Sequence, residues 1–118
     1  MTGVTIYHNP HGGSSKNALA VAEEHNVDAE VVLYMKTPPD RATLEQIVSV
    51  LEDPVEDLVR KDSKFKELGL NPEDYVGNAR AVVYLLTERK ALMQRPLLVK
   101  SDRAIIGRPK DRIAEFLG

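Results

Sequence analysis

Two strand-like runs joined by a very short turn lie near the end of the chain, and they constrain the fold more than any other feature. Leu97-Leu98-Val99 is a continuous apolar run of the kind found in buried strands. Ser101-Asp102 supplies a turn, and residues 103–106 form a second run that ends at Gly107. Two strands connected by so few residues must pair in antiparallel fashion. The sequence therefore predicts a hairpin at one side of a sheet.

The start of the chain predicts a β-α-β unit. Residues 4–7 are β-branched and aromatic, and the strand that they predict ends at Asn9-Pro10. A helix is expected next, with Ser14 or Ser15 as its N-terminal cap, and residues 29–34 form a second β-rich run. A helix between two neighbouring strands requires a right-handed crossover and parallel pairing. Together with the hairpin, this unit predicts a mixed four-stranded sheet with helices on both faces.

The middle of the chain, about residues 40–94, is interpreted as a helical insertion between these two halves. Two consecutive prolines stop the preceding strand, and Asp40 is a natural N-cap. Apolar residues recur at i, i+3, i+4 and i+7 over 44–51 and again over 79–86, so each of these helices is expected to bury one face in the core. The chain has 118 residues, which favours a single domain over 1–118. The predicted fold class is α/β, with a thioredoxin-like arrangement.

Composition excludes several classes of function. The chain has no cysteine, which removes disulfides, thiolate metal sites and thiol catalysis from this polypeptide. The 3 histidines lack the spacing of a metal-binding motif, so we predict no metal site. The 16 Lys and Arg residues against 18 Asp and Glu give a net charge of −2, which argues against a polycationic nucleic-acid binder.

No segment indicates export or membrane insertion. The first residues do not combine a basic region with an apolar one, as a signal peptide does. The longest apolar run, Ala81–Leu86, is far too short to span a bilayer. The basic residues in 60–66 are interpreted as a solvated face. We therefore expect a cytoplasmic protein that has neither a membrane nor a nucleic acid as its partner.

The loop after the first predicted strand is the candidate site for chemistry. It reads HNPHGGSSKNAL over residues 8–19, which is neither a Walker A motif nor a GxGxxG loop. The backbone amides of Gly12, Gly13, Ser14 and Ser15 are expected at a helix N-terminus, where the helix dipole favours an anion. The alternative interpretation is a glycine-softened turn followed by an ordinary serine cap.

Several separated motifs resemble one family, the glutaredoxin-coupled arsenate reductases, which form the ArsC family of the thioredoxin superfamily. The resemblance runs through essentially the whole chain in order. It rests on YHNPHGGSSKNAL at 7–19, Tyr34 with Thr37-Pro38-Pro39, Leu58-Val59-Arg60-Lys61, Phe65-Lys66-Glu67-Leu68-Gly69-Leu70, Arg95-Pro96-Leu97-Leu98-Val99 and Gly107-Arg108-Pro109. The related Spx-type regulators share the fold but carry a CxxC near the glycine loop, which this chain lacks.

The resemblance implies a nucleophilic cysteine at the helix N-terminus, arsenate held by three arginines, and turnover completed by glutathione and glutaredoxin. Gly12 stands at the position of the cysteine. Matching arginines are present at Arg60, Arg95 and Arg108. Supporting positions of the family are matched by His8, Asn9 and Lys16, and Pro96 matches a proline that is typically cis. The chain is therefore expected to keep an anion site and to lack the nucleophile.

Three functions remain open at this point. The first is a pseudoenzyme that binds a small oxyanion (phosphate, arsenate or sulfate) without redox chemistry. The second is a regulatory module that docks a protein partner, as the Spx-type regulators dock RNA polymerase. The third is an arsenate reductase in which glutathione, implied by the resemblance alone, supplies the thiol in the space left at Gly12. The residues themselves indicate no bound cofactor.

Overall fold

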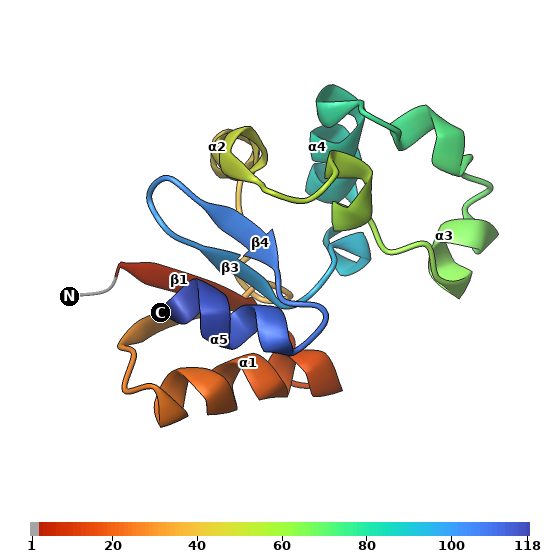
Figure 1. Ribbon diagram of the computed structural model, residues 1–118. Coiled ribbons are helices and arrows are strands. Elements are labelled where there is room, and N and C mark those ends of the chain that lie inside the picture. The colour runs from red at the N-terminus through yellow and green to blue at the C-terminus, as the bar shows by residue number, and fades with distance from the viewer. Residues whose placement is uncertain (1–2) are drawn as a thin grey trace.

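A mixed four-stranded sheet forms the centre of the computed structural model, which describes residues 3–118 (Figure 1). The strands are β1 (Val4–His8), β2 (Ala29–Leu33), β3 (Leu97–Val99) and β4 (Ala104–Ile106). Their spatial order is β2-β1-β3-β4. Strand β1 pairs with β2 in parallel, whereas β1 with β3 and β3 with β4 pair antiparallel. The predicted α/β, thioredoxin-like sheet is confirmed.

Two helices cover one face of the sheet. They are α1 (Gly13–Glu24) and α5 (Asp111–Leu117), which lie together below the strands in Figure 1. Ile6 and Leu98 point to this face, where they pack with buried residues such as Ala18 and Phe116. Because successive side chains of a strand alternate between the two faces, the neighbours of Ile6 and Leu98 face the opposite way. This face therefore has a core of its own.

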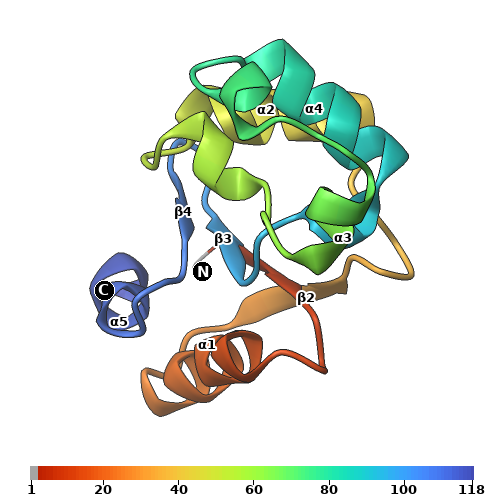
Figure 2. The same cartoon turned by 90° about the vertical axis from the view of Figure 1, so that its right-hand side faces the viewer.

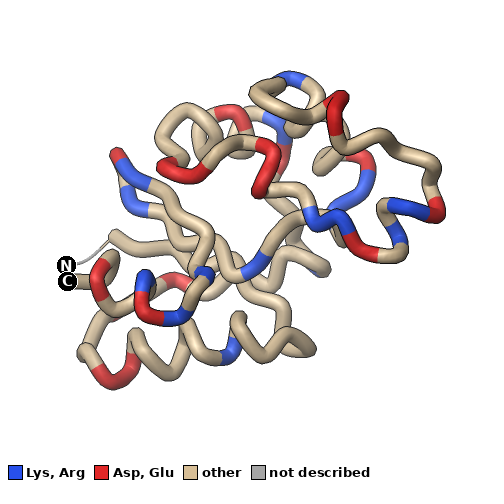
Figure 3. The backbone as a smooth tube through the Cα atoms, turned by 45° about the vertical axis from the view of Figure 1, so that its right-hand side comes forward, with Lys and Arg blue, Asp and Glu red and all other residues tan. Residues whose placement is uncertain are grey.

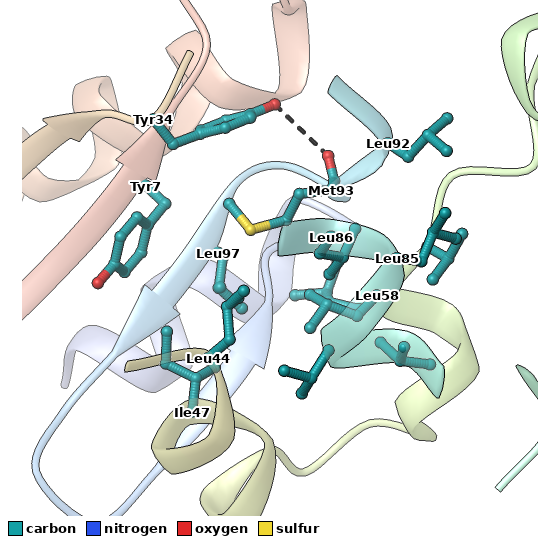
Figure 4. Packing of buried hydrophobic residues seen from close by; sticks show 14 of the residues in the cluster. Tyr7, Tyr34, Leu44, Ile47, Leu58, Leu85, Leu86, Leu92, Met93 and Leu97 are labelled. Atoms are coloured by element: carbon teal, nitrogen blue, oxygen red, sulfur yellow. Dashed lines mark hydrogen bonds between the residues drawn. The ribbon is translucent and has the colours of Figure 1, made fainter. Parts of the chain in front are cut away.

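The other face is covered by the helical segment between β2 and β3, as predicted for about residues 40–94 (Figure 2). Its elements are α2 (Arg41–Val50), η1 (Val55–Leu58), α3 (Ser63–Glu67), η2 (Pro72–Tyr75), α4 (Ala79–Glu88) and η3 (Lys90–Leu92). Tyr7 and Leu97 extend from the strands into this second core (Figure 4). There the Tyr34 hydroxyl donates to the carbonyl of Met93 over 3.4 Å, which ties the end of β2 to the residues before β3.

The predicted helix signals mostly hold. Asp40 accepts a hydrogen bond from the Thr43 backbone N–H and so caps α2. In α4 the predicted stripe differs at its start, since Ala79 is exposed and Leu85 is buried instead. Within the described residues, no helix is long and apolar enough to cross a membrane.

Candidate anion-binding site

The loop after β1 enters α1 through a tight turn. The backbone N–H of Gly12 donates to the carbonyl of Asn9 over 3.0 Å, which closes a β-turn. Gly12 is the N-cap residue of α1, and no side chain caps this helix. The prediction of a serine cap is therefore wrong. Ser14 and Ser15 lie inside the first helical turn, because the β-turn brings the chain into the helix at Gly13.

This turn changes which amides are free to bind an anion. The amide of Gly12 is occupied by the Asn9 carbonyl, so it does not point out of the helix as expected. The amides of Gly13, Ser14 and Ser15 are the first of α1, and such amides have no acceptor within their own helix. The positive end of the helix dipole lies at the same place. Of the four amides predicted to bind an anion, those of Gly13, Ser14 and Ser15 can therefore contact a negatively charged group.

Ser15 fixes the loop to the helix. Its buried hydroxyl accepts a 2.9 Å hydrogen bond from the Asn9 backbone N–H and lies 2.8 Å from Nδ1 of His8. The Asn9 side chain in turn accepts from the backbone N–H of His11 over 3.0 Å. Burial lowers the pKa of His8, a hydrogen bond with the Ser15 backbone acts in the opposite direction, and the nearby charge of Lys16 lowers the pKa further. His8 and Asn9 thus support the loop from within.

The arginine cluster, defined as Arg60, Arg95 and Arg108, comes from three separate segments. Arg60 follows η1, Arg95 precedes β3, and Arg108 follows β4. The Arg60 backbone N–H donates to the carbonyl of Leu92 over 2.7 Å, which holds its segment beside the residues that lead to Arg95. Nε of Arg108 donates to the carbonyl of Arg95 over 2.8 Å. The fold therefore gathers residues that lie far apart in the sequence.

A proline follows two members of the cluster. The Arg95–Pro96 peptide bond is cis, which is the geometry that the resemblance implies. The Arg108–Pro109 bond is also cis, which the sequence did not indicate. Pro96 is buried, and a Cβ added to Gly107 would come within 2.7 Å of its Cγ. Glycine at 107 thus allows the segments that carry Arg95 and Arg108 to pack directly against each other.

The charges of Arg60 and Arg95 lie close enough to Arg108 to affect its guanidinium. Burial lowers the pKa of Arg108, and the positive charges of Arg60 and Arg95 lower it further, whereas Tyr34 has the opposite influence. In the described part of the chain, the cluster has one carboxylate partner, Asp62, which lies 3.3 Å from Arg60. Figure 3 shows basic stretches of chain where the helical segment joins the sheet. Like charges with so little compensation favour the approach of an anion.

Arg95 connects the arginine cluster to the glycine loop. A Cβ built on Gly12 would lie 3.1 Å from Nε of Arg95. This Nε is buried and finds no hydrogen-bond partner within the described residues. The backbone of Gly12 is extended, with φ −99° and ψ 126°, so its torsion angles do not require glycine. The missing side chain instead gives Arg95 room to lie against the loop.

The remaining predicted residues lie around this core of the site. Gly13 and Lys16 are exposed and Ser14 is half-buried. Nothing lies within 4 Å of the position that a Cβ on Gly13 would take. The influence of Lys16 on His8 places its charge near the loop. Among the residues described, no group of three or more His, Cys, Asp or Glu side chains is placed to hold a metal ion.

Two cavities were not predicted. The larger, about 840 Å³, lies between α2 and α4 and is bordered by Val48, Val83 and Tyr84, away from the glycine loop. Tyr84 is 67% exposed, yet it occupies an ordinary surface position of an amphipathic helix, so no sequence pattern indicates a groove here. The smaller, about 330 Å³, is bordered by Arg108 and by Asp57, which no motif singled out.

The fold agrees with comparisons to known proteins. The ArsC family model matches residues 7–116, so the chain belongs to the ArsC family. It is 37% identical over 117 residues to the uncharacterized protein YfgD of Escherichia coli, covering 98% of this chain and 97% of that one. It is 34% identical over 119 residues to an arsenate reductase of Neisseria meningitidis, covering 99% and 100%.

A solved structure shows the same relationship. The arsenate reductase of Vibrio cholerae is 28% identical and superposes with a TM-score of 0.78, covering 95% of each chain. The sheet and the helical segment described above thus belong to a common ArsC framework. This chain itself has no cysteine.

Proposed function

We propose that this protein binds a tetrahedral oxyanion (phosphate, arsenate or sulfate) between the first amides of α1 and the arginine cluster, without thiol-based reduction. The observation that carries the proposal is the buried, unpartnered Nε of Arg95 beside Gly12. A buried donor of this kind is rare and costly unless an acceptor reaches it. A small shift of the flexible Arg95 side chain would present its N–H groups to an anion at the helix N-terminus.

The absence of reduction follows from the chemistry of the side chains at the loop. Arsenate reduction in this family depends on a thiolate that forms a covalent bond to arsenic, and Gly12 stands at that position. A serine hydroxyl has no disulfide-like oxidised form, so it cannot supply the two electrons of the reduction even with His8 beside it. The Ser15 hydroxyl is also engaged by His8 and the Asn9 backbone. The anion site is thus proposed to act without an attacking group.

Titration calorimetry with phosphate, arsenate and sulfate tests the binding. We expect a dissociation constant of about a millimolar or tighter, which corresponds to roughly −4 kcal/mol or better. Arg95→Gln should weaken binding, since it removes a charge that faces the loop. Arg89→Gln removes one from an exposed helix end outside the site and should leave binding unchanged. Absence of binding by all three anions would refute the proposed function.

The glutathione-assisted alternative is separated by a gain-of-function variant. Gly12→Cys adds a thiol, and Arg95 must yield by a few tenths of an ångström to admit its Cβ. With glutathione and glutaredoxin present, arsenate reduction to arsenite would oxidise the cysteine and one glutathione to a mixed disulfide, which supplies the two electrons. A second glutathione, through glutaredoxin, would then restore the cysteine thiol and leave as glutathione disulfide. We expect turnover by the variant and none by the natural chain. Turnover by the natural chain would favour the glutathione-assisted alternative.

A further inference from the structure

The smaller cavity adjoins the arginine cluster through Arg108. It has a volume of about 330 Å³, and its wall includes both basic and acidic side chains. Lys61 and Arg108 supply positive charge, and Asp53 and Asp57 supply negative charge. The cavity thus differs from the arginine cluster, in which positive charge dominates. A ligand held by Arg108 can extend into this space.

The two carboxylates of the cavity are not equivalent. Asp53 is fully committed, since one oxygen accepts from the Ile106 backbone N–H at 2.9 Å and the other from Arg112 at 2.7 Å. The Asp57 side chain has no hydrogen-bond or ion-pair partner within residues 3–118, and it is exposed. Asp57 is therefore the carboxylate that is free to meet a cation.

The donors of the cavity are also partly free. Arg108 is fixed at Nε by the Arg95 carbonyl, and its terminal nitrogens have no partner in the described structure. The Gln94 side chain accepts from the Arg95 backbone N–H over 3.3 Å through its oxygen, which leaves its NH₂ group available. Lys61 is already bound to two backbone carbonyls. Anion-binding groups and one uncommitted carboxylate therefore border the same space.

We propose that the ligand of the anion site is zwitterionic: an oxyanion joined by a short linker to an ammonium group, as in an aminoalkyl phosphate. The oxyanion contacts the arginine cluster, and the ammonium group enters the smaller cavity and pairs with Asp57. This inference rests on the proposed function and narrows its ligand class. A purely anionic ligand would leave the Asp57 charge uncompensated beside it, whereas an ammonium group converts that repulsion into attraction.

The test compares matched ligands by NMR or calorimetric titration at low salt. Two pairs differ mainly in the charge of the tail: 2-aminoethyl phosphate against n-propyl phosphate, and 3-aminopropyl phosphate against n-butyl phosphate. Inorganic phosphate reports on the anion site alone. We expect the amine to bind more tightly in at least one pair, by up to about fivefold, which is the range of an exposed ion pair. The preference should shrink as salt is raised.

Two substitutions of Asp57 test whether this residue causes the preference for the amine over the alkyl phosphate. Asp57→Asn should abolish it while inorganic phosphate still binds, and Asp57→Lys should invert it. Asp102→Asn removes an equal charge from the exposed turn between β3 and β4 and should keep the preference. The inference is overturned if phosphate binds but neither amine is preferred, or if Asp57→Asn retains the preference. If inorganic phosphate does not bind at all, the proposed function itself fails.

Discussion

The Nε of Arg108 donates a 2.8 Å hydrogen bond to the carbonyl oxygen of Arg95, so one edge of the Arg108 guanidinium is fixed to the backbone of a second arginine. A guanidinium held at Nε directs its two terminal nitrogens as a fork, which matches the oxygens of a phosphate or arsenate. Burial lowers the pKa of Arg108, and the positive charges of Arg60 and Arg95 lower it further. The hydrogen bond to Arg95 thus orients Arg108 against that repulsion.

Arg108→Lys is expected to weaken oxyanion binding by about tenfold or more. Lysine keeps the charge, but it can neither bond to the Arg95 carbonyl through an Nε nor present a planar fork. The expected loss follows from the roughly 1.5–3 kcal/mol of a hydrogen bond to a charged group. Calorimetric titration with phosphate measures it, with Arg89→Lys as the matched control. Equal affinity of the Arg108→Lys variant and the natural chain would show that Arg108 contributes charge alone.

Substitutions of the adjacent residues Gly12 and Gly13 are expected to differ in their effect on oxyanion affinity. Gly12→Ala places a Cβ 3.1 Å from Nε of Arg95, so the guanidinium must move and oxyanion affinity should fall severalfold. Gly13→Ala meets nothing within 4 Å and lies in the first turn of α1. It should leave affinity unchanged and stabilise the protein by up to about 0.5–1 kcal/mol. Binding titrations and urea denaturation of both variants decide this, and equal affinities would contradict the role given to Gly12.

The sequence predicted the sheet well because its signals are local. Leu97–Val99 and the short turn that follows determine an antiparallel pair, and the apolar stripe from Leu44 determines which face of α2 is buried. The prediction of where α1 starts was wrong for a physical reason. Serine is a residue type favoured at helix N-caps, which suggested Ser14. The turn from Asn9 to Gly12 instead decides where the helix begins.

The site was less predictable than the fold. Arg60, Arg95 and Arg108 carry no local signal of convergence, and their selection depended on the resemblance to a family. Their proximity results from the packing of the helical segment on β3, which no periodicity reveals. The free carboxylate of Asp57 could not be predicted either, because the sequence does not show that the fold pairs Asp53 with Arg112 and leaves the Asp57 side chain without a partner among the described residues.

Ser15→Ala tests the internal support of the loop. It removes the acceptor of the buried Asn9 N–H and the partner of His8, so two polar groups lose their hydrogen bonds. We expect a loss of about 1–3 kcal/mol in the free energy of unfolding, measured by urea denaturation. Ser14→Ala, at a half-buried position where the hydroxyl has no partner among residues 3–118, should cost less than about 0.5 kcal/mol. Equal losses in the two variants would contradict this account of the loop.

The pKa of His8 predicts a pH dependence of stability. Burial lowers the pKa of His8 in the folded state below its usual value of 6.5, so between these two values the unfolded chain binds a proton that the folded chain does not. The free energy of unfolding should therefore fall as pH decreases through 6.5, by at most about 1.4 kcal/mol per pH unit, until the pKa of the folded state is passed. Urea denaturation at steps between pH 7.5 and 5 measures this slope.

The range between pH 7.5 and 5 distinguishes the contribution of His8 to the pH dependence of stability from that of the carboxylates. The pKa values of Asp40, Glu52 and Glu56 are lowered from 3.8, 4.5 and 4.5, so the stability that these groups contribute is lost only at more acidic pH. His8→Gln should flatten the dependence between pH 7.5 and 5, because the buried titrating ring is gone. His25→Gln, which replaces an exposed ring at the end of α1, should keep it. A slope that survives His8→Gln would mean that another group titrates in this window and that the neutral His8–Ser15 pair is not what holds the loop.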